Sequence, residues 1–190
     1  MSVEPPFVTH YYRADRAPFR SLSEVDDSDV ETVLAGLAEG SRRRFGPHYL
    51  ALRRATEEKA RALFLTAGGR PERRHPHYFV LGESPWFAGL YDHPREIRIL
   101  LNQLPPASTS FTWVDSITAL GLGRDLGVPQ PREAQRRRVY GIDQLSVATA
   151  EATPASVEPT DYEGHQWRLV DQYVEVQLWS DAPIRHCLDR

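Results

Sequence analysis

The chain has 190 residues, a formal net charge of −3, 41% hydrophobic residues and 10% aromatic residues. This is enough to bury a core as one domain, and no apolar run approaches the ~18 residues of a membrane span. The single cysteine, Cys187, excludes an internal disulfide and a thiolate cluster for zinc. The first ten residues lack the basic and apolar regions of a signal peptide. We therefore expect one domain over residues 1–190, without a membrane segment, in the cytoplasm.

The N-terminal third is predicted to hold a strand followed by two helices. Residues 7–13 (FVTHYYR) are rich in aromatic and β-branched side chains, as strands are. From Val30 the apolar residues recur at helical spacing, which predicts a helix ending near Gly40. A second helix is expected from Pro47 to the glycine pair at 68–69. Its expected core-facing residues are Leu52, Ala55, Leu63 and Phe64.

The rest of the chain has the pattern of short strands separated by turns. Strands are predicted over 77–81, 96–101, 110–116, 139–143 and 173–179. Residues 151–162 are poor in large apolar side chains and predict a loop. Helices early in the chain and strands late in it indicate an α+β fold with a mixed or antiparallel sheet, the helices concentrated in the N-terminal third.

The last predicted strand, YVEVQLW, has an apolar face and a polar face. Side chains alternate across a strand, so Val174, Val176 and Leu178 share one side. Glu175 and Gln177 share the other side with aromatic residues. One interpretation is an edge strand whose polar face meets solvent. The other is a carboxylate held on a rigid strand at the floor of a cleft.

A strongly basic segment runs from residue 41 to residue 75, where ten Arg or Lys residues accompany three acids. Such a segment suits a phosphate-bearing ligand or nucleic acid, although a solvated helix face explains it equally well. The stretch GLGRDLG at 121–127 lacks the third glycine and the following long helix of a dinucleotide fingerprint. His75 and His77 have no third metal ligand at informative spacing, so no metal site is predicted.

Five stretches, taken in order, resemble the DarT-type ADP-ribosyltransferases, bacterial toxins that attach ADP-ribose from NAD to a base in single-stranded DNA. They are THYYRAD (9–15), HYLALRR (48–54), PHYFVLGESPWFAGLY (76–91), REIRILLNQLPPASTSFTWVDS (95–116) and DQYVEVQLWSDAPI (171–184). The resemblance implies an ADP-ribosyltransferase-like split sheet, NAD as substrate and single-stranded nucleic acid as acceptor. It also implies an antitoxin as partner.

The resemblance places Glu175 at the family's catalytic glutamate, where a carboxylate would stabilise the positive charge that develops on the ribose. Arg54 is the second catalytic candidate, and Arg53 is the alternative partner for the NAD diphosphate because guanidinium binds such groups in a bidentate manner. Asp115 is interpreted as an acceptor-side or a structural residue. The candidates for binding NAD are His10, Tyr12, Arg13, Arg53, Tyr78 and Gln177. Those for stacking on its rings are Tyr78, Trp113, Tyr173 and Trp179.

Two further interpretations stay open from the sequence alone. His10 either binds the ribose of NAD, as the resemblance implies, or satisfies a backbone carbonyl within the fold. The whole protein is either a transferase, a non-catalytic module that binds nucleic acid or a protein on the same fold, or an enzyme acting on another small molecule. Binding of NAD separates the first of these three functions from the other two.

Overall fold

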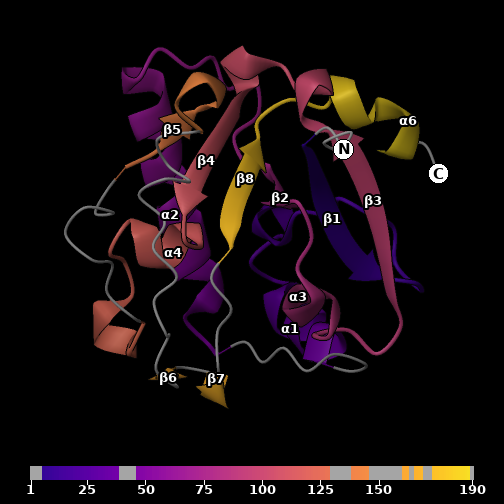
Figure 1. Cartoon of the computed structure of the whole chain (residues 1–190). Coiled ribbons are helices and arrows are strands. Elements are labelled where there is room, and N and C mark those ends of the chain that lie inside the picture. The colour runs from indigo at the N-terminus through magenta and orange to yellow at the C-terminus, as the bar shows by residue number, and fades with distance from the viewer. Residues whose placement is uncertain are drawn as a thin grey trace.

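The computed structural model describes residues 6–38, 46–128, 138–145, 160–162, 165–168 and 173–188. Its main sheet has six strands in the order β3-β1-β2-β8-β4-β5, and every paired neighbour in it is antiparallel (Figure 1). The strands are β1 (Phe7–Arg13), β2 (His77–Leu81), β3 (Pro94–Leu100), β4 (Thr109–Trp113), β5 (Tyr140–Gly141) and β8 (Val174–Leu178). The predicted α+β class and the antiparallel sheet are therefore confirmed.

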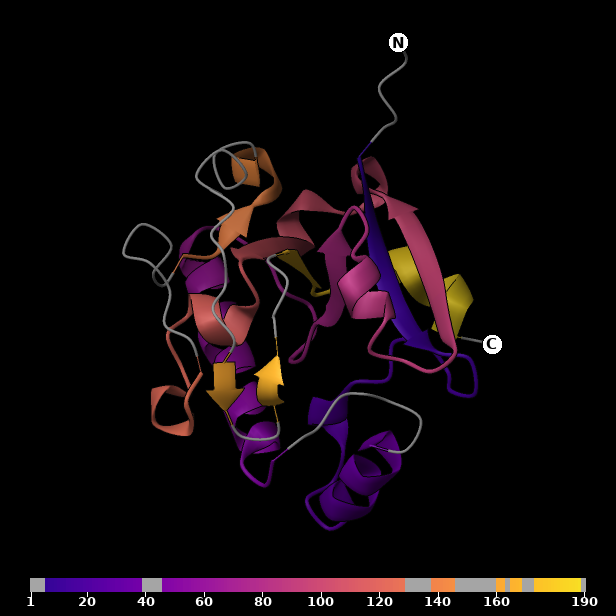
Figure 2. The same ribbon diagram turned by 60° about the horizontal axis from the view of Figure 1, so that its bottom comes forward.

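Helices surround this sheet on two sides. They are α1 (Val30–Ala38), α2 (Tyr49–Thr66), α3 (Pro85–Ala88), α4 (Ser116–Ala119) and α6 (Arg185–Leu188). The two longest, α1 and α2, are the two predicted in the N-terminal third. Figures 1 and 2 show α2 on the side of β4 and α6 beside β1 and β3. None of the described helices is long and apolar enough to cross a membrane.

Several predicted boundaries differ from the structure. The strand expected over 110–116 ends at Trp113, because the side chain of Asp115 caps α4 instead. Part of the loop expected over 151–162 is a strand, β6 (Thr160–Tyr162), which pairs with β7 (His165–Arg168) in a separate two-stranded sheet. Residues 151–159 and Gly40 lie outside the described residues.

The helix α2 ends where its glycines predict, and its buried face agrees with the prediction at Phe64, which is buried, and at Leu63, which packs against the same cluster. Gly68 has φ +91°, a left-handed conformation that favours glycine, and the Gly69 N–H donates to the Phe64 carbonyl. Ala55, which was also predicted to face the core, is exposed, whereas Thr56 and Glu57 are buried. Two polar residues that the apolar pattern did not predict therefore share the buried face with Phe64.

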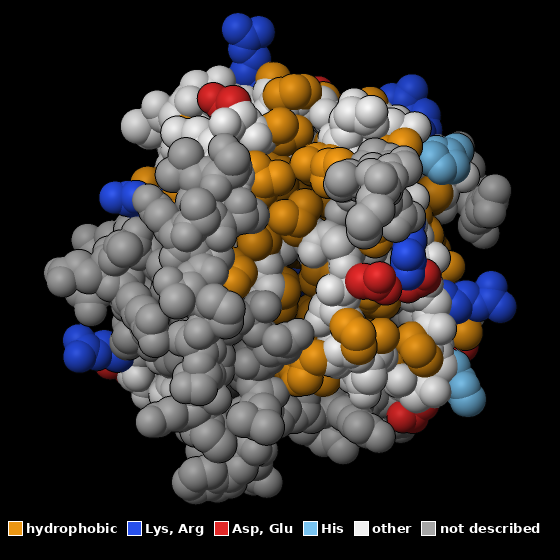
Figure 3. Space-filling view, viewed as in Figure 1, with side chains coloured by type: hydrophobic (Ala, Val, Ile, Leu, Met, Phe, Trp, Pro, Cys, Tyr) orange, Lys and Arg blue, Asp and Glu red, His pale blue; other side chains and the backbone are white. Residues whose placement is uncertain are grey.

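The strand β8 lies inside the sheet, between β2 and β4, so it is not the edge strand that one interpretation proposed. Its apolar side chains join the main core with Phe79 and Phe111 from the neighbouring strands. Figure 3 shows hydrophobic side chains reaching the surface in a band near β8. The polar face of β8, which carries Glu175 and Gln177, is buried as well. Its side chains must therefore find their hydrogen bonds within the protein.

The sheet opens between β1 and β2. These strands pair only at Val8↔Leu81 and Thr9↔Val80, whereas β1 and β3 pair along the whole of β1. Beyond Thr9 a side chain replaces the backbone ladder, because His10 Nδ1 lies 2.8 Å from the Tyr78 carbonyl oxygen. The divergence of the two strands leaves room beside the polar face of β8.

Candidate active site

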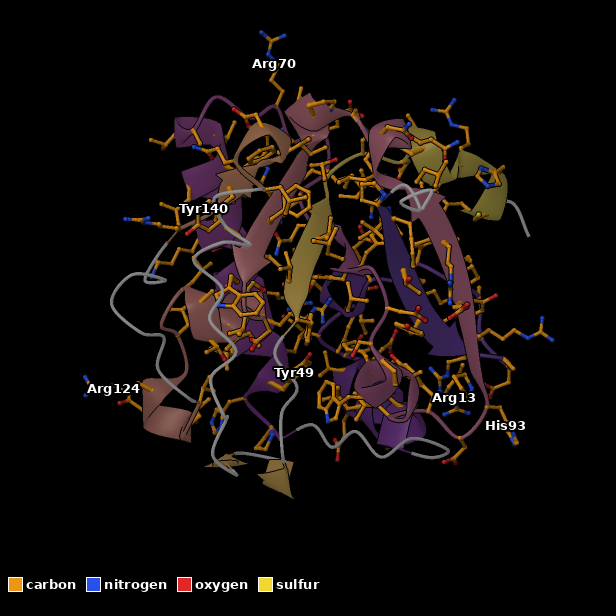
Figure 4. All side chains as sticks on the ribbon, in the orientation of Figure 1. Arg13, Tyr49, Arg70, His93, Arg124 and Tyr140 are labelled. Atoms are coloured by element: carbon orange, nitrogen blue, oxygen red, sulfur yellow. The ribbon has the colours of Figure 1, made fainter. Side chains whose placement is uncertain are left out.

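A cavity of ≈ 260 Å³ lies at this opening of the sheet. Its lining comes from β1, residues 19–22, α2, β2, α3, the start of α4 and β8. Figure 4 shows two of the lining residues, Arg13 and Tyr49, in its lower half, whereas Arg70 and Arg124 project away from the molecule. The lining includes four charged residues that the sequence singled out, Arg13, Arg53, Asp115 and Glu175. They come from β1, α2, the N-cap of α4 and β8, which the fold brings together.

The Glu175 carboxylate is held rigidly at the cavity wall. The residue is only 9% exposed, and its Oε1 accepts hydrogen bonds from the Ser116 N–H at 3.2 Å and from Gln177 Nε2 at 3.0 Å. Gln177 is itself fixed, since it donates to Thr112 Oγ1 at 2.9 Å and accepts from Ser110 Oγ at 2.8 Å. Gln177 does not line the cavity, so it positions Glu175 and is not placed to contact a ligand.

The surroundings of Glu175 make its carboxyl group titrate near neutral pH. Burial and the negative charge of Asp115 raise its pKa from 4.5 to about 7, although the hydrogen bonds from Ser116 and Gln177 and the charge of Arg53 act in the opposite direction. Burial also raises the pKa of Asp115 above its usual range. Two carboxyl groups with raised pKa values in one cavity are typical of a site for proton or charge chemistry.

A buried hydrogen-bond network around Glu57 holds the Arg53 side chain in place. This glutamate is fully buried, and its carboxylate accepts from Arg53 Nε at 3.0 Å and from the Tyr78 hydroxyl at 3.0 Å. Its other oxygen lies 2.6 Å from His75 Nδ1. The guanidinium also lies 4.4 Å above the centre of the Tyr78 ring and donates to the Tyr49 hydroxyl at 3.2 Å. Within the described part of the chain, Arg53 Nη2 has no hydrogen-bond partner.

His10 lines the cavity, but both of its ring nitrogens are already engaged by the backbone. The Phe19 N–H donates to Nε2 at 3.1 Å, which leaves the proton on Nδ1 to be donated to the Tyr78 carbonyl. Burial lowers the pKa of His10 from 6.5 to about 4, so the ring is neutral. Of the two interpretations from the sequence, the structure thus has the histidine that satisfies a backbone carbonyl. His10 ties residue 19 to β2.

Arg54, the residue after Arg53 on α2, points away from the cavity. Its guanidinium donates to the carbonyl oxygens of Ser23 and Val25 and to the Asp27 carboxylate. It is absent from the cavity lining, so the structure does not bring it together with Glu175. Tyr12 is also absent from the lining and stacks on His10, with ring centres 5.9 Å apart.

The other NAD-binding candidates have mixed positions. Arg13 lines the cavity while it binds Asp15 and the Gly36 carbonyl. Tyr78 lines it beneath Arg53. Of the stacking candidates, Tyr173 lines the cavity, but the ring of Trp179 is fully buried and packs with α2. Trp113 packs against the main core on the other face of the sheet.

Three residues of the site were missed from the sequence, namely Tyr49, Glu57 and Trp86. Glu57 follows Arg53 by four residues, the spacing of a helical ion pair, so that signal was present. Trp86 has its ring centre 6.4 Å from that of Tyr173, with 26° between the planes. No pattern in the sequence links these two rings, because they are brought together only by the packing of α3 near β8.

The histidines that bracket Pro76 serve separate carboxylates. His75 contacts Glu57, and His77 Nε2 lies 2.7 Å from Asp181 Oδ1. Among the described residues, no group of three His, Cys, Asp or Glu side chains is arranged to hold a metal ion.

Comparisons of the chain with protein-family models, curated proteins and solved structures give no match. A proposal about function therefore depends on the chemistry of the cavity and on the resemblance in the sequence.

Proposed function

We propose that this protein is an NAD-dependent ADP-ribosyltransferase that modifies a nucleobase in single-stranded DNA or a related nucleic acid or nucleoside. The observation that carries the proposal is that Glu175, on an interior strand, lines the same cavity as Arg53. A fixed carboxylate and a fixed guanidinium in one cavity match the charges of the reacting half and the diphosphate half of NAD.

Glu175 has the environment that this reaction needs. Breaking the bond between nicotinamide and ribose gives an oxocarbenium ion, which a nearby carboxylate stabilises. Both hydrogen bonds to Glu175 from described residues are made to Oε1, so Oε2 can face the ribose. Because the pKa of Glu175 is about 7, the charged form is present above neutral pH, and the rate of nicotinamide release should rise with pH through that value.

Arg53 is assigned to the diphosphate in place of Arg54. Glu57 and Tyr49 orient its guanidinium, and Nη2 is left for a ligand. A guanidinium fixed in this way loses less side-chain freedom when it binds an anion. Tyr173 and Trp86 provide aromatic faces on the same cavity for a planar ring.

The finer description of the fold belongs to the same proposal. The short pairing of β1 with β2, followed by the divergence of the strands, supports an ADP-ribosyltransferase-like split sheet. The cytoplasmic location and an antitoxin that neutralises the activity are further expectations from the resemblance to DarT-type enzymes. An antitoxin would be required only if the transferase acts on the DNA of its own cell.

A non-catalytic module that binds nucleic acid is less well supported. That function would use the arginines of α2 as an exposed basic face. The side chains of Arg53 and Arg54 are only 19% and 31% exposed, and each binds acceptors within the protein. Neither is available as a solvated cation for a phosphate chain.

The test is incubation of the protein with NAD and a single-stranded oligonucleotide, followed by measurement of free nicotinamide and of the mass of the oligonucleotide. We expect release of nicotinamide and a mass gain of one ADP-ribose. Glu175→Gln should abolish both while NAD still binds by calorimetry. If the wild-type protein neither binds NAD nor releases nicotinamide, the proposed function is wrong.

A further inference from the structure

Glu175 pairs with two strands, and each of them leads to another charged residue of the cavity. On one side Val80 of β2 pairs with Glu175, and Arg53 lies over Tyr78 of the same strand. On the other side Thr112 of β4 pairs with Glu175, and Asp115 follows shortly after the end of that strand. Both Arg53 and Asp115 line the cavity. A ligand that contacts Arg53 and Glu175 therefore lies in the same cavity as Asp115.

Asp115 is held in a fixed relation to Glu175. Its Oδ1 accepts from the Thr118 N–H at 3.0 Å, which caps α4. The next residue, Ser116, donates its N–H to Glu175 Oε1. One short turn therefore carries Asp115 and also donates a hydrogen bond to Glu175, which relates the positions of the two carboxylates.

We propose that Asp115 is the general base that accepts the proton lost by the acceptor. The inference rests on the proposed function and adds a second catalytic residue to it. The bond between ribose C1′ and the nicotinamide nitrogen breaks, and its electron pair leaves with nicotinamide. A nitrogen of the acceptor donates its lone pair to C1′ to form the new bond. The proton on that nitrogen passes to the Asp115 carboxylate and later to water.

The roles of the two carboxylates follow from their positions. Glu175 lies next to Arg53, on the side where NAD would bind, and it must stay charged while the positive charge develops on the ribose. Asp115 lines the same cavity, so it is placed to meet the acceptor as it approaches C1′. A nitrogen that forms a fourth bond becomes strongly acidic, so a carboxylate is basic enough to take its proton. The acceptor class is therefore a base with a hydrogen on the reacting nitrogen.

The experiment measures two rates for one variant, Asp115→Asn. Asparagine is as good a helix cap as aspartate, so α4 is preserved while the base is lost. We expect the rate of transfer to a single-stranded oligonucleotide to fall by about 10²–10⁴-fold. The release of nicotinamide to water should fall much less. The pH profile of transfer should also lose the ionisation of a group that must be deprotonated. Serine caps a helix as well as aspartate does, so Asp115→Ser should lose transfer in the same way. Agreement between the two variants would show that the loss comes from the missing carboxylate and not from misfolding of one variant.

The outcomes separate this inference from the proposed function. If wild-type protein modifies the oligonucleotide and Asp115→Asn does so at the same rate, Asp115 is not the base, and the transferase proposal stands. If the variant loses transfer and nicotinamide release equally, Asp115 is structural, and the inference is again wrong. If wild-type protein releases no nicotinamide, both proposals fail together.

Discussion

The two walls of the cavity are held by different kinds of interaction. The strand wall, made of β8 and the buried face of α2, is fixed by hydrogen bonds among buried side chains, with Gln177 and Glu57 as their centres. The loop wall, residues 19–22, continues into residues 23–25, and side chains from other elements bind the backbone of this segment. His10 accepts from Phe19, and Arg54 donates to the carbonyls of Ser23 and Val25.

The difference shows which wall can carry chemistry. A buried network whose members satisfy one another fixes side-chain positions, and loss of one member leaves its partners without hydrogen bonds. The loop wall meets solvent, and the Asp27 side chain that binds Arg54 is 87% exposed. Interactions of that kind contribute little each. The strand wall therefore suits the reacting groups, and the loop wall suits the entry of a ligand.

The largest expected effect comes from breaking the strand wall at Glu57. Glu57→Ala removes the acceptor for Arg53 and Tyr78 and leaves a mostly buried guanidinium without its carboxylate, so the free energy of unfolding should fall by about 3–5 kcal/mol. Chemical denaturation measures it. The control is the next residue, Glu58→Ala, whose exposed ion pair with Arg74 should contribute only about 0–1 kcal/mol. Equal losses for the two variants would mean that the buried network does not hold the wall.

The second prediction sharpens the comparison by changing the charge at Glu175. Its folded-state pKa lies above the ordinary value, so its contribution to stability is full below pH 4.5 and is lost as the pH rises through about 7. Glu175→Gln removes that dependence. At a pH of about 8 the variant should be more stable than wild type by up to about 3 kcal/mol.

The measurement is denaturation of both proteins at several pH values. The difference between them should disappear below pH 4.5, where Glu175 is protonated in the folded and the unfolded protein alike. Glu83→Gln, a change on the exposed surface, should show no such trend. A Glu175→Gln variant that is less stable at every pH would show that the carboxylate supports the fold and does not strain it.

The sequence predicted the strand wall in part. Alternation along YVEVQLW assigned Glu175 and Gln177 to one face, and the aromatic and β-branched residues of 7–13 and 77–81 gave both strands with correct bounds. The sequence did not decide whether β8 lies inside the sheet or at its edge. A polar face that is buried and hydrogen-bonded within the protein has the same sequence pattern as a polar face that meets solvent. Only the contacts with Ser110 and Thr112 distinguish them.

The choice between Arg53 and Arg54 was beyond the sequence for a related reason. Adjacent residues on a helix point about 100° apart, so the buried face decides which one meets the cavity. That face of α2 carries Thr56 and Glu57, while Ala55 is exposed. A fully buried glutamate contradicts the apolar pattern, and it is tolerated because three neighbours share its two oxygens.

The third prediction tests that choice directly. Arg53→Lys keeps the charge but loses the planar fork that Glu57 and Tyr49 orient, so the affinity for NAD should fall by about tenfold. Arg54→Lys, the matched change one residue along the helix, should leave the affinity unchanged. Calorimetric titration of NAD into both variants measures the two constants. If only Arg54→Lys lowered the affinity for NAD, Arg54 and not Arg53 would bind the diphosphate, as the sequence first indicated.

The smallest expected effect comes from releasing the loop wall. Arg54→Ala removes the hydrogen bonds to Ser23, Val25 and Asp27. Water can replace the lost donor at Asp27, which is 87% exposed, and at Val25, which is partly exposed, whereas Ser23 is buried. The free energy of unfolding should therefore fall by about 1–2 kcal/mol. Amide hydrogen exchange should quicken in residues 19–27 and stay unchanged in β8. Faster exchange in β8 as well would mean that the two walls unfold as one unit. The strand wall and the loop wall would then differ in solvent exposure but not in local stability.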